Sequence, residues 1–301
     1  MTDPAVRAHI HTTAAGVTLT ADVWPGSGGH TVVLLHGGGQ TRHAWTDTAR
    51  ALVRNGHTAV PVDLRGHGDS DWAPDGDYEL SAIAGDIASL CDDFDDKPIL
   101  VGASLGGITG LMLEGEVAPG SLRALVLVDI VPRMNTVGAN RVVAFMSERM
   151  DEGFASLDDV ADAIAAFNPN RPRPTDLTGL TKNLRQRDGR WFWHWDPSFI
   201  RAAQGTSEQK QIRNPQLLTD TLRRVEVPLM LVRGRQSDLV TDAEVAEFCE
   251  EFPHAAFHDV AGAGHMVAGD RNDAFSAAVV EFISTLEPPE SESTTSTDQE
   301  Y

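Results

Sequence analysis

The chain has 301 residues, of which 41% are hydrophobic, and its formal net charge of −20 argues against nucleic-acid binding, because phosphate recognition needs clustered lysine and arginine. No segment approaches the about 18 consecutive apolar residues of a membrane span, and the N-terminus lacks the apolar core of a secretory signal. We therefore expect a cytoplasmic protein that binds neither nucleic acid nor membrane.

Short apolar runs alternate with helical patterns along most of the chain. Residues 6–24 alternate polar and apolar side chains around a turn at Gly16, which predicts two antiparallel strands at the edge of a sheet. Further strands are then predicted at 31–36, 57–63, 98–103 and 122–129, with helices at 42–54, 79–93 and 104–115. This alternation is typical of an α/β fold with a mostly parallel central sheet and helices on both faces.

The alternation stops at Pro132 and resumes at Val225, which predicts an insertion. Within it, helical patterns cover 138–150 and 157–167. After it come strands at 227–232 and 256–260 and a last helix at 271–286. We therefore predict four segments along the chain, namely a first core part at 1–132, a mainly helical cap at 133–222, a second core part at 223–286 and a disordered acidic tail at 287–301.

A tight turn from strand to helix is predicted at Gly102-Ala103-Ser104-Leu105-Gly106. The residues around Ser104 have almost no side chain, as a nucleophile elbow requires. Such a turn lifts the serine hydroxyl above the carboxyl edge of the sheet and directs the N–H of Leu105, at a helix N-terminus, toward a substrate oxygen. Ser104 is therefore the candidate nucleophile, and an ordinary serine helix cap is the structural alternative.

Two further polar residues, Asp238 and His265, lie in loops just after the predicted strands 227–232 and 256–260. A serine hydroxyl is a poor nucleophile near neutral pH, so it needs a histidine to take its proton and a carboxylate to orient that histidine. The chain order serine, acid, histidine suits a nucleophile elbow on such a sheet. Asp129, which ends the predicted strand 122–129, points to the same edge and is an alternative acid.

A second donor to a substrate oxygen is predicted in the loop His36-Gly37-Gly38-Gly39. The loop follows a predicted buried strand, and its glycines let the backbone approach a substrate closely. We expect the N–H of Gly38 to complete an oxyanion hole with the N–H of Leu105. His36 is expected to hydrogen-bond to backbone in this loop.

These motifs, together with Asp63-Leu64-Arg65-Gly66-His67-Gly68-Asp69-Ser70, occur in an order that resembles the α/β-hydrolase superfamily. The resemblance covers roughly residues 15–285 in pieces. It is to the branch that contains cap-bearing serine esterases, lactonases and cofactor-free haloperoxidases. It implies the α/β-hydrolase fold, a cap above the serine and no cofactor. It also implies that Asp63 and Arg65 anchor a loop that supports the oxyanion loop.

The resemblance also favours one of the two acids. Most members carry the acid after the penultimate strand, which is where Asp238 stands, 27 residues before His265. We therefore predict Ser104, Asp238 and His265 as a catalytic triad. Asp129 is expected to fix the first hinge of the cap.

Three tryptophans alternate in Arg190-Trp191-Phe192-Trp193-His194-Trp195, inside the predicted cap. On an extended segment they share one face, which either lines an apolar pocket or fastens the cap to the core. We predict Trp193 and Met266, the neighbour of His265, as substrate-binding residues.

No metal site is predicted. His9 and His11 share one face of the N-terminal strand, where two imidazoles can bind a metal. The sequence identifies no third ligand near them, so we assign no metal.

The sequence thus predicts a serine hydrolase that cleaves a small to medium, largely apolar carboxylic ester or lactone through an acyl-enzyme. Carbon–carbon bond hydrolysis and perhydrolysis use the same triad and stay open, although the carbon–carbon hydrolases typically have Asn where Ala103 stands. A ligand-binding receptor that retains the triad is the alternative from a different class. The sequence makes no prediction of the oligomeric state.

Overall fold

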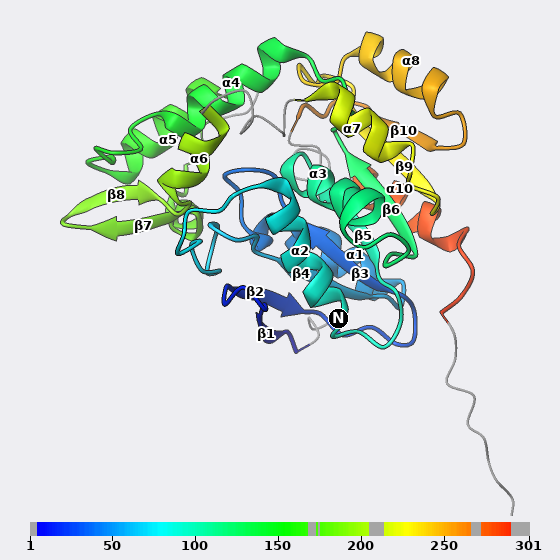
Figure 1. Ribbon diagram of the computed structural model, residues 1–301. Coiled ribbons are helices and arrows are strands. Elements are labelled where there is room, and N and C mark those ends of the chain that lie inside the picture. The colour runs from blue at the N-terminus through cyan, green and yellow to red at the C-terminus, as the bar shows by residue number, and fades with distance from the viewer. Residues whose placement is uncertain (1–4, 168–172, 174, 205–213, 266–271, 290–301) are drawn as a thin grey trace, which may run out of the picture.

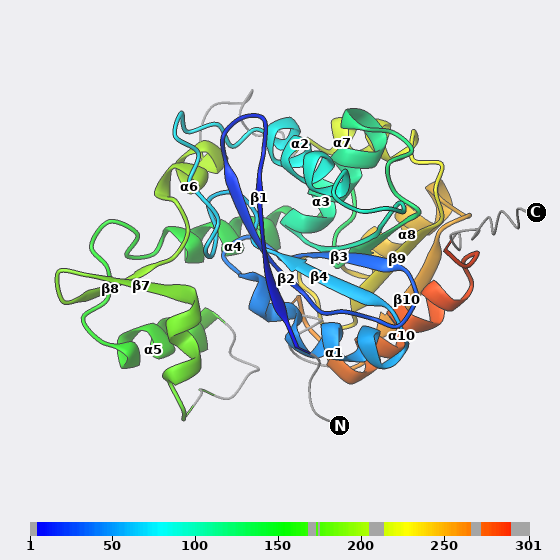
Figure 2. The ribbon, with the colours of Figure 1, turned by 90° about the horizontal axis from the view of Figure 1, so that it is seen from below.

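The computed structural model describes residues 5–167, 173, 175–204, 214–265 and 272–289 (Figure 1). Within these ranges a central sheet carries helices on both faces, and a further group of elements projects from one side of it (Figures 1 and 2). None of the helices in the described ranges combines the length and the apolar character that crossing a bilayer needs.

The described residues form one large sheet with the strand order β1-β2-β4-β3-β5-β6-β9-β10. Its strands are β1 (Arg7–Thr12), β2 (Thr18–Val23), β3 (Thr31–Leu35), β4 (Thr58–Val62), β5 (Ile99–Ala103), β6 (Ala124–Val128), β9 (Leu229–Gly234) and β10 (Ala256–Val260). β1 and β2 pair antiparallel, and β2 also pairs antiparallel with β4. All pairs from β4 to β10 are parallel. The predicted hairpin and mostly parallel sheet are confirmed.

The register of the sheet brings several loops to one edge. Leu35 is paired with Gly102, and Ala103 is paired with Val128, which is paired in turn with Val232. The loops that follow β3, β5, β6 and β9 therefore leave the sheet side by side at its carboxyl edge. Open parallel sheets bind their ligands at this edge.

Helices cover both faces of the sheet, because successive strand residues point to opposite sides. On one face, Val32 and Leu34 form a buried cluster with α1 (Thr46–Arg54) and α10 (Asn272–Ser284). On the other face, Val33 and Leu35 belong to a cluster that includes side chains of α2 (Leu80–Cys91), α3 (Leu105–Met112), α7 (Pro215–Leu222) and α8 (Asp242–Glu251). Strands buried on both faces read as continuous apolar runs, which explains their clear signal in the sequence.

The elements between β6 and α7 form a separate group, which we call the cap. They are α4 (Thr136–Ser147), α5 (Leu157–Phe167), a 3₁₀ turn (Thr178–Asn183), β7 (Leu184–Arg187), β8 (Arg190–Trp193) and α6 (Pro197–Gln204). The cap was expected to be mainly helical, but β7 and β8 form an antiparallel hairpin. The hairpin turns at Asp188 and Gly189, whose φ angles of 49° and 75° suit a type I′ turn. The Asp-Gly dipeptide was the sequence signal for it.

Helix α7 packs on the core and not in the cap, although the predicted cap range of 133–222 includes it. It lies against α3 and the π-helical turn that follows α3, Leu113–Val117. A Cβ on Gly115 of that turn would lie 2.5 Å from the Thr221 oxygen, so glycine is required at this contact. Of the predicted tail at 287–301, residues 290–301 lie outside the described residues.

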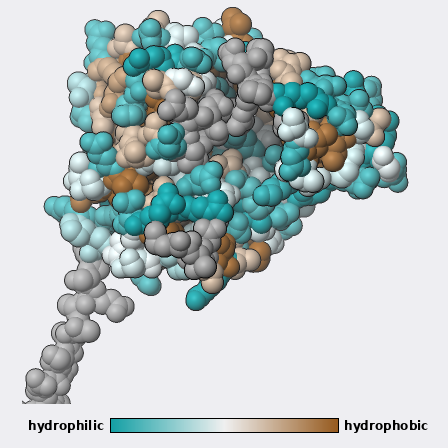
Figure 3. All heavy atoms as spheres, turned by 180° about the vertical axis from the view of Figure 1, so that it is seen from behind, coloured by the Kyte–Doolittle hydropathy of each residue, from teal (hydrophilic) through white to brown (hydrophobic). Residues whose placement is uncertain are grey.

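The face of the molecule seen from behind is largely hydrophilic (Figure 3). In the view from behind, hydrophobic residues form small areas separated by polar ones (Figure 3). The exposed large hydrophobic side chains in the described ranges are Val6, Ile10, Trp72, Val117, Val137 and Phe257. Scattered side chains of this kind are normal on a globular protein.

Candidate active site

Ser104 occupies the turn between β5 and α3. Its backbone has φ 47° and ψ −111°, a combination that residues other than glycine rarely adopt. Neighbouring strands hold the turn, because the Ser104 N–H donates to Val128 O (3.1 Å) and the Gly106 N–H donates to His36 O (3.2 Å). Backbone strain that a rigid frame maintains is typical of functional sites.

The glycines beside Ser104 are required by close backbone contacts. A Cβ on Gly102 would lie 2.3 Å from the Gly106 oxygen, and a Cβ on Gly106 would lie 2.3 Å from the Leu35 oxygen. Backbone atoms inside a packed sheet cannot move away from such contacts at low cost. The tight strand-to-helix turn predicted from the sequence is therefore confirmed.

His265 is hydrogen-bonded to Asp129. His265 Nδ1 lies 2.6 Å from Asp129 Oδ2, and the Asp129 side chain is only 1% exposed. The Ser237 hydroxyl also donates to Oδ2 (2.6 Å), and the Gly234 N–H donates to Oδ1 (3.3 Å). A buried carboxylate needs such partners, and in this position they aim it at the histidine.

The prediction that Asp238 orients His265 is wrong. The Asp238 side chain is 50% exposed and forms an ion pair with Arg141 of α4, at 2.6 Å. The neighbouring residue, Ser237, is the one that contacts Asp129. Because β6 and β9 are adjacent and parallel, both bring polar residues to the same edge, and a position after a strand does not select between them. Asp129 thus faces the histidine and is not a hinge of the cap.

The loop after β3 runs beside the serine. A Cβ on Gly37 would lie 3.5 Å from the Ser104 Cβ. Gly38 and Ser104 line the same cavity, and Leu105 is the first residue of α3. The N–H groups of Gly38 and Leu105 therefore belong to the two chain segments that meet at Ser104, which is what an oxyanion hole needs.

His36 holds the oxyanion loop from within the protein. Its Nε2 accepts the Leu64 N–H (3.1 Å), so Nδ1 carries the proton and donates to Gly37 O (2.8 Å). The expected backbone-binding role of His36 is confirmed. Complete burial lowers its pKa to about 4, so the ring is neutral at physiological pH.

The loop after β4 supports the same region through two buried ion pairs. Asp63 accepts the backbone N–H of Arg42 (2.6 Å) and pairs with its guanidinium, just beyond the oxyanion loop. Arg65 donates to both oxygens of Asp86 in α2, at 2.5 and 2.7 Å. The anchoring roles expected for Asp63 and Arg65 are confirmed.

A cluster of three buried histidines connects these loops with the cap. The ring centroids of His36 and His67 are 5.1 Å apart, and those of His67 and His194 are 5.7 Å apart. His194 Nδ1 accepts the Gly68 N–H (2.7 Å), and its Nε2 faces Gly39 O (3.4 Å). Burial lowers the pKa of His67 to about 3 and that of His194 well below its ordinary value. The cap is therefore attached beside the oxyanion loop.

A cavity of about 410 Å³ lies between the cap and the carboxyl edge of the sheet. Ser104 and His265 line it from the core side. Apolar side chains form the cap wall, namely Val142, Phe145, Met146, Ile164, Phe167, Leu180, Trp193 and Trp195. Polar side chains also line it, namely Gln40, Thr41, His43, Lys182 and Asn183. Mostly apolar pockets with a few polar groups are typical of small-molecule sites.

Of the residues predicted to bind substrate, Trp193 lines the cavity and also packs the cap. It stacks on Trp195 with ring centroids 4.8 Å apart, and its Nε1–H donates to Glu148 O (3.2 Å). Its ring contacts with Phe145, Phe154 and Trp195 lie within the cap, so the packing role seen for Trp193 is inside the cap. Met266 lies outside the described residues.

The described lining of the cavity does not suit a catalytic metal. It includes the histidines His43 and His265 but no aspartate, glutamate or cysteine. His265 already uses Nδ1 for Asp129. Catalytic zinc sites commonly have three protein ligands, which is more than the described lining offers.

Comparisons with known proteins agree with this fold. A sequence pattern described as "Alpha/beta hydrolase family" matches residues 32–278. "Esterase Rv0045c" of Mycobacterium tuberculosis is 33% identical over 257 residues, which cover 82% of this chain and 80% of that protein. The solved structure of that esterase has a TM-score of 0.72 to this chain, with 94% of each chain covered and 29% identity.

Two further similarities are more distant. "Non-heme chloroperoxidase CPO-A1" of Kitasatospora aureofaciens is 26% identical over 296 residues, covering 91% of this chain and 98% of that protein. The solved structure of an E-2-(acetamidomethylene)succinate hydrolase has a TM-score of 0.77 and 24% identity, covering 92% of this chain and 100% of the other. The second similarity concerns the fold alone.

Proposed function

The chain belongs to the alpha/beta hydrolase family, and we propose that it is a serine esterase whose catalytic triad is Ser104, His265 and Asp129. The observation that carries the proposal is the hydrogen bond of 2.6 Å between His265 and the buried Asp129, beside the cavity that Ser104 also lines. Similarity to an esterase at 33% identity supports the same class of reaction.

In the first half of the reaction, Ser104 is acylated. Its hydroxyl oxygen attacks the ester carbonyl carbon while His265 Nε2 takes the hydroxyl proton. The carbonyl oxygen becomes an oxyanion, which the N–H groups of Gly38 and Leu105 stabilise. The intermediate then breaks its bond to the alcohol oxygen, and the alcohol leaves with the proton from His265.

In the second half, water replaces the alcohol. His265 takes a proton from the water, whose oxygen attacks the acyl carbon on Ser104. The bond to the serine oxygen breaks, the proton returns to Ser104, and the carboxylic acid leaves. Asp129 stays ionised throughout, holding the His265 ring and stabilising its positive form.

The cavity supports a small to medium, largely apolar ester or lactone as substrate. Its volume of about 410 Å³ lies within the range of small-molecule sites, and most of the side chains in its cap wall are aliphatic or aromatic. Burial of an apolar acyl or alcohol group against this wall contributes roughly 25 cal/mol per Å² of contact.

Labelling with a fluorophosphonate probe tests the nucleophile. The parent protein should form a covalent adduct at Ser104, and the Ser104→Ala variant should not, because alanine has no hydroxyl to attack phosphorus. Hydrolysis of aryl esters should fall by several orders of magnitude in the same variant. Ser81→Ala, which alters an exposed serine on α2, is the matched control and should label like the parent. Equal labelling of the Ser104→Ala variant would exclude this residue.

Perhydrolysis is a second candidate, supported by the similarity to a non-heme chloroperoxidase. In that reaction an oxygen of hydrogen peroxide, in place of water, attacks the acyl carbon on Ser104 while His265 takes its proton. The bond to the serine oxygen then breaks, the proton returns to Ser104, and a peroxy acid leaves. Peracid formation from acetate esters and hydrogen peroxide, compared between the parent and Ser104→Ala, tests whether this activity uses the same serine.

A further inference from the structure

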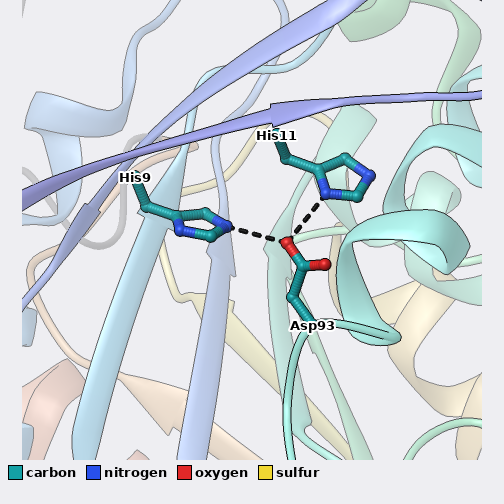
Figure 4. Close-up of side chains that lie close together, drawn as sticks. All are labelled: His9, His11 and Asp93. Carbon is teal, nitrogen blue, oxygen red and sulfur yellow. Dashed lines mark hydrogen bonds and ion pairs between the residues drawn. The ribbon is translucent and has the colours of Figure 1, made fainter.

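Two histidines and an aspartate from distant parts of the chain meet beside the N-terminal strand. His9 and His11 project from β1 toward Asp93, which lies between α2 and β5 (Figure 4). Asp93 is 84 residues from His9, so the sequence did not reveal it as the missing third ligand. This cluster lies outside the cavity that holds Ser104.

The ligand atoms of the cluster face one another. Asp93 Oδ2 lies 2.9 Å from His9 Nε2 and 2.8 Å from His11 Nδ1, and the three atoms are all within 4.8 Å of each other. Around a tetrahedral zinc ion, with bonds of about 2.0–2.2 Å, ligand atoms stand roughly 3.3–3.5 Å apart. The side chains are 32%, 11% and 35% exposed for His9, His11 and Asp93, so they have room for this small adjustment.

Ser89 of α2 orients one of the two rings. His11 Nε2 lies 2.8 Å from Ser89 Oγ. When Nε2–H donates to this oxygen, the lone pair of Nδ1 faces the Asp93 carboxylate and can bind a metal ion, whereas a proton on Nδ1 makes the same contact a hydrogen bond. Metal-binding histidines commonly hold their other ring N–H through such a hydrogen bond.

We propose that His9, His11 and Asp93 bind a divalent transition metal ion, and that Zn²⁺ is the best match. Imidazole nitrogens favour zinc and its neighbours, whereas Ca²⁺ and Mg²⁺ prefer oxygen ligands alone. Three protein ligands leave a coordination position for water. The carboxylate and the net charge of −20 both favour a cation at this surface.

A metal at this position would stabilise the N-terminal strand. β1 is the edge strand of the described sheet and pairs with β2. The ion would join β1 directly to the segment after α2. Asp93 precedes β5 whereas Ser104 follows it, and the five residues of that strand span about 16 Å. We therefore expect metal binding to change stability and not ester hydrolysis.

Two calorimetric measurements on chelator-treated protein test the site. Isothermal titration with ZnCl₂ gives the stoichiometry and the Kd, and scanning calorimetry gives the melting temperature with and without zinc. We expect one Zn²⁺ per chain and a melting temperature that rises with zinc, because the ion binds the folded state. The His9→Gln/His11→Gln double variant should lose this binding. Asp93→Asn should weaken it by more than tenfold, and Ser89→Ala by about tenfold. His254→Ala, which alters an exposed histidine elsewhere, is the matched control and should bind like the parent.

Two measurements keep this test decisive. Melting temperatures of all variants in chelator separate lost metal binding from lost folding. Fluorophosphonate labelling with one equivalent of zinc should be unchanged in the parent. A parent that does not bind zinc overturns the proposal. So does a double variant whose Kd equals that of the parent, which would place the zinc at other ligands.

Discussion

The carboxyl edge of the sheet and the cap line the same cavity. They differ in the contacts that hold them and in the side chains that they present to the cavity. At the edge, core groups bind both oxygens of Asp129, and neighbouring strands hold the strained turn at Ser104. The cap joins the core through contacts such as those of His194 with the oxyanion loop and of Asp196 with the Tyr78 hydroxyl (2.6 Å). Its cavity wall is mostly apolar, with Lys182 and Asn183 as the polar cap residues of the described lining.

The sheet edge and the cap are therefore suited to different tasks, namely holding the reacting groups and fitting the substrate. Reacting groups must be held within about half an ångström, which a rigid sheet edge provides. A wall of apolar side chains can be repacked at moderate cost, so it can vary with the substrate. We therefore expect changes at the edge to alter the rate of the chemical step, and changes in the cap to alter selectivity and stability.

The largest expected effect is the loss of activity in Asp129→Asn. The amide preserves the shape of the side chain but no longer stabilises a protonated His265, and in serine proteases this change lowers kcat by about 10⁴. Asp238→Asn should leave kcat within a few-fold of the parent. Steady-state kinetics on one aryl ester compares the two variants. The opposite order of losses would return the acid role to Asp238.

Trp193→Ala should affect both selectivity and stability, since this side chain lines the cavity and is 6% exposed. Removal of a buried tryptophan costs about 3–5 kcal/mol of unfolding free energy. The ratio of kcat/KM for bulky and small esters should change in the same variant. Trp191→Ala alters a partly buried tryptophan of the same strand and is the control. Selectivity that does not change in Trp193→Ala would leave this residue a packing role alone.

Acid should destabilise the protein through the three buried histidines. The pKa is about 4 for His36 and about 3 for His67, below the ordinary 6.5, and that of His194 is also strongly lowered by burial. Below pH 6.5 the unfolded chain binds protons that the folded chain does not, so stability is highest above pH 6.5 and falls as the pH drops toward 4. The slope should reach up to about 4 kcal/mol per pH unit.

Chemical unfolding at several values between pH 7 and pH 5 measures this slope. His67→Gln removes one of the three groups, so it should reduce the slope by about a third even if it lowers stability at every pH. An unchanged slope in this variant would show that other groups cause the acid sensitivity.

His194→Ala should loosen the cap from the core. The change leaves the partly buried Gly68 N–H without its acceptor, which should cost about 1 kcal/mol, the low end for an unsatisfied donor. Because His194 also faces Gly39 O, we expect KM to rise together with a lower melting temperature. Tyr78→Phe removes the hydroxyl that donates to Asp196 and accepts the Ala73 N–H, so it should lower the melting temperature with less effect on KM.

The smallest effect is expected for the ion pair between Arg141 and Asp238. Both side chains are about half exposed, so solvent screens their attraction, and such pairs contribute about 0–1 kcal/mol. A double-mutant cycle with Arg141→Gln and Asp238→Asn measures the coupling. A coupling well above this range would mean that the pair closes the cap more firmly than its exposure implies.

The sequence alone determined most of the sheet and the position of the nucleophile. Strands β3, β4, β5, β6 and β9 are buried on both faces, so their apolar runs are visible without any knowledge of contacts. The turn at Ser104 was visible as well, because steric contacts at Gly102 and Gly106 restrict these positions to glycine. The hairpin of the cap also has a local signal in the sequence, the Asp188-Gly189 dipeptide at its turn.

Only the tertiary structure decided which residues meet. Asp129 and His265 are 136 residues apart, and Asp129 and Asp238 follow adjacent parallel strands, so local patterns treat the two acids alike. The contact depends on the direction of each side chain and on the partners that hold it, such as Ser237 for Asp129. Asp93 likewise joins His9 and His11 only through the packing of α2 beside β1. Local sequence determines turns and buried strands through sterics and periodicity, whereas long-range pairing of side chains follows from the register of the completed sheet.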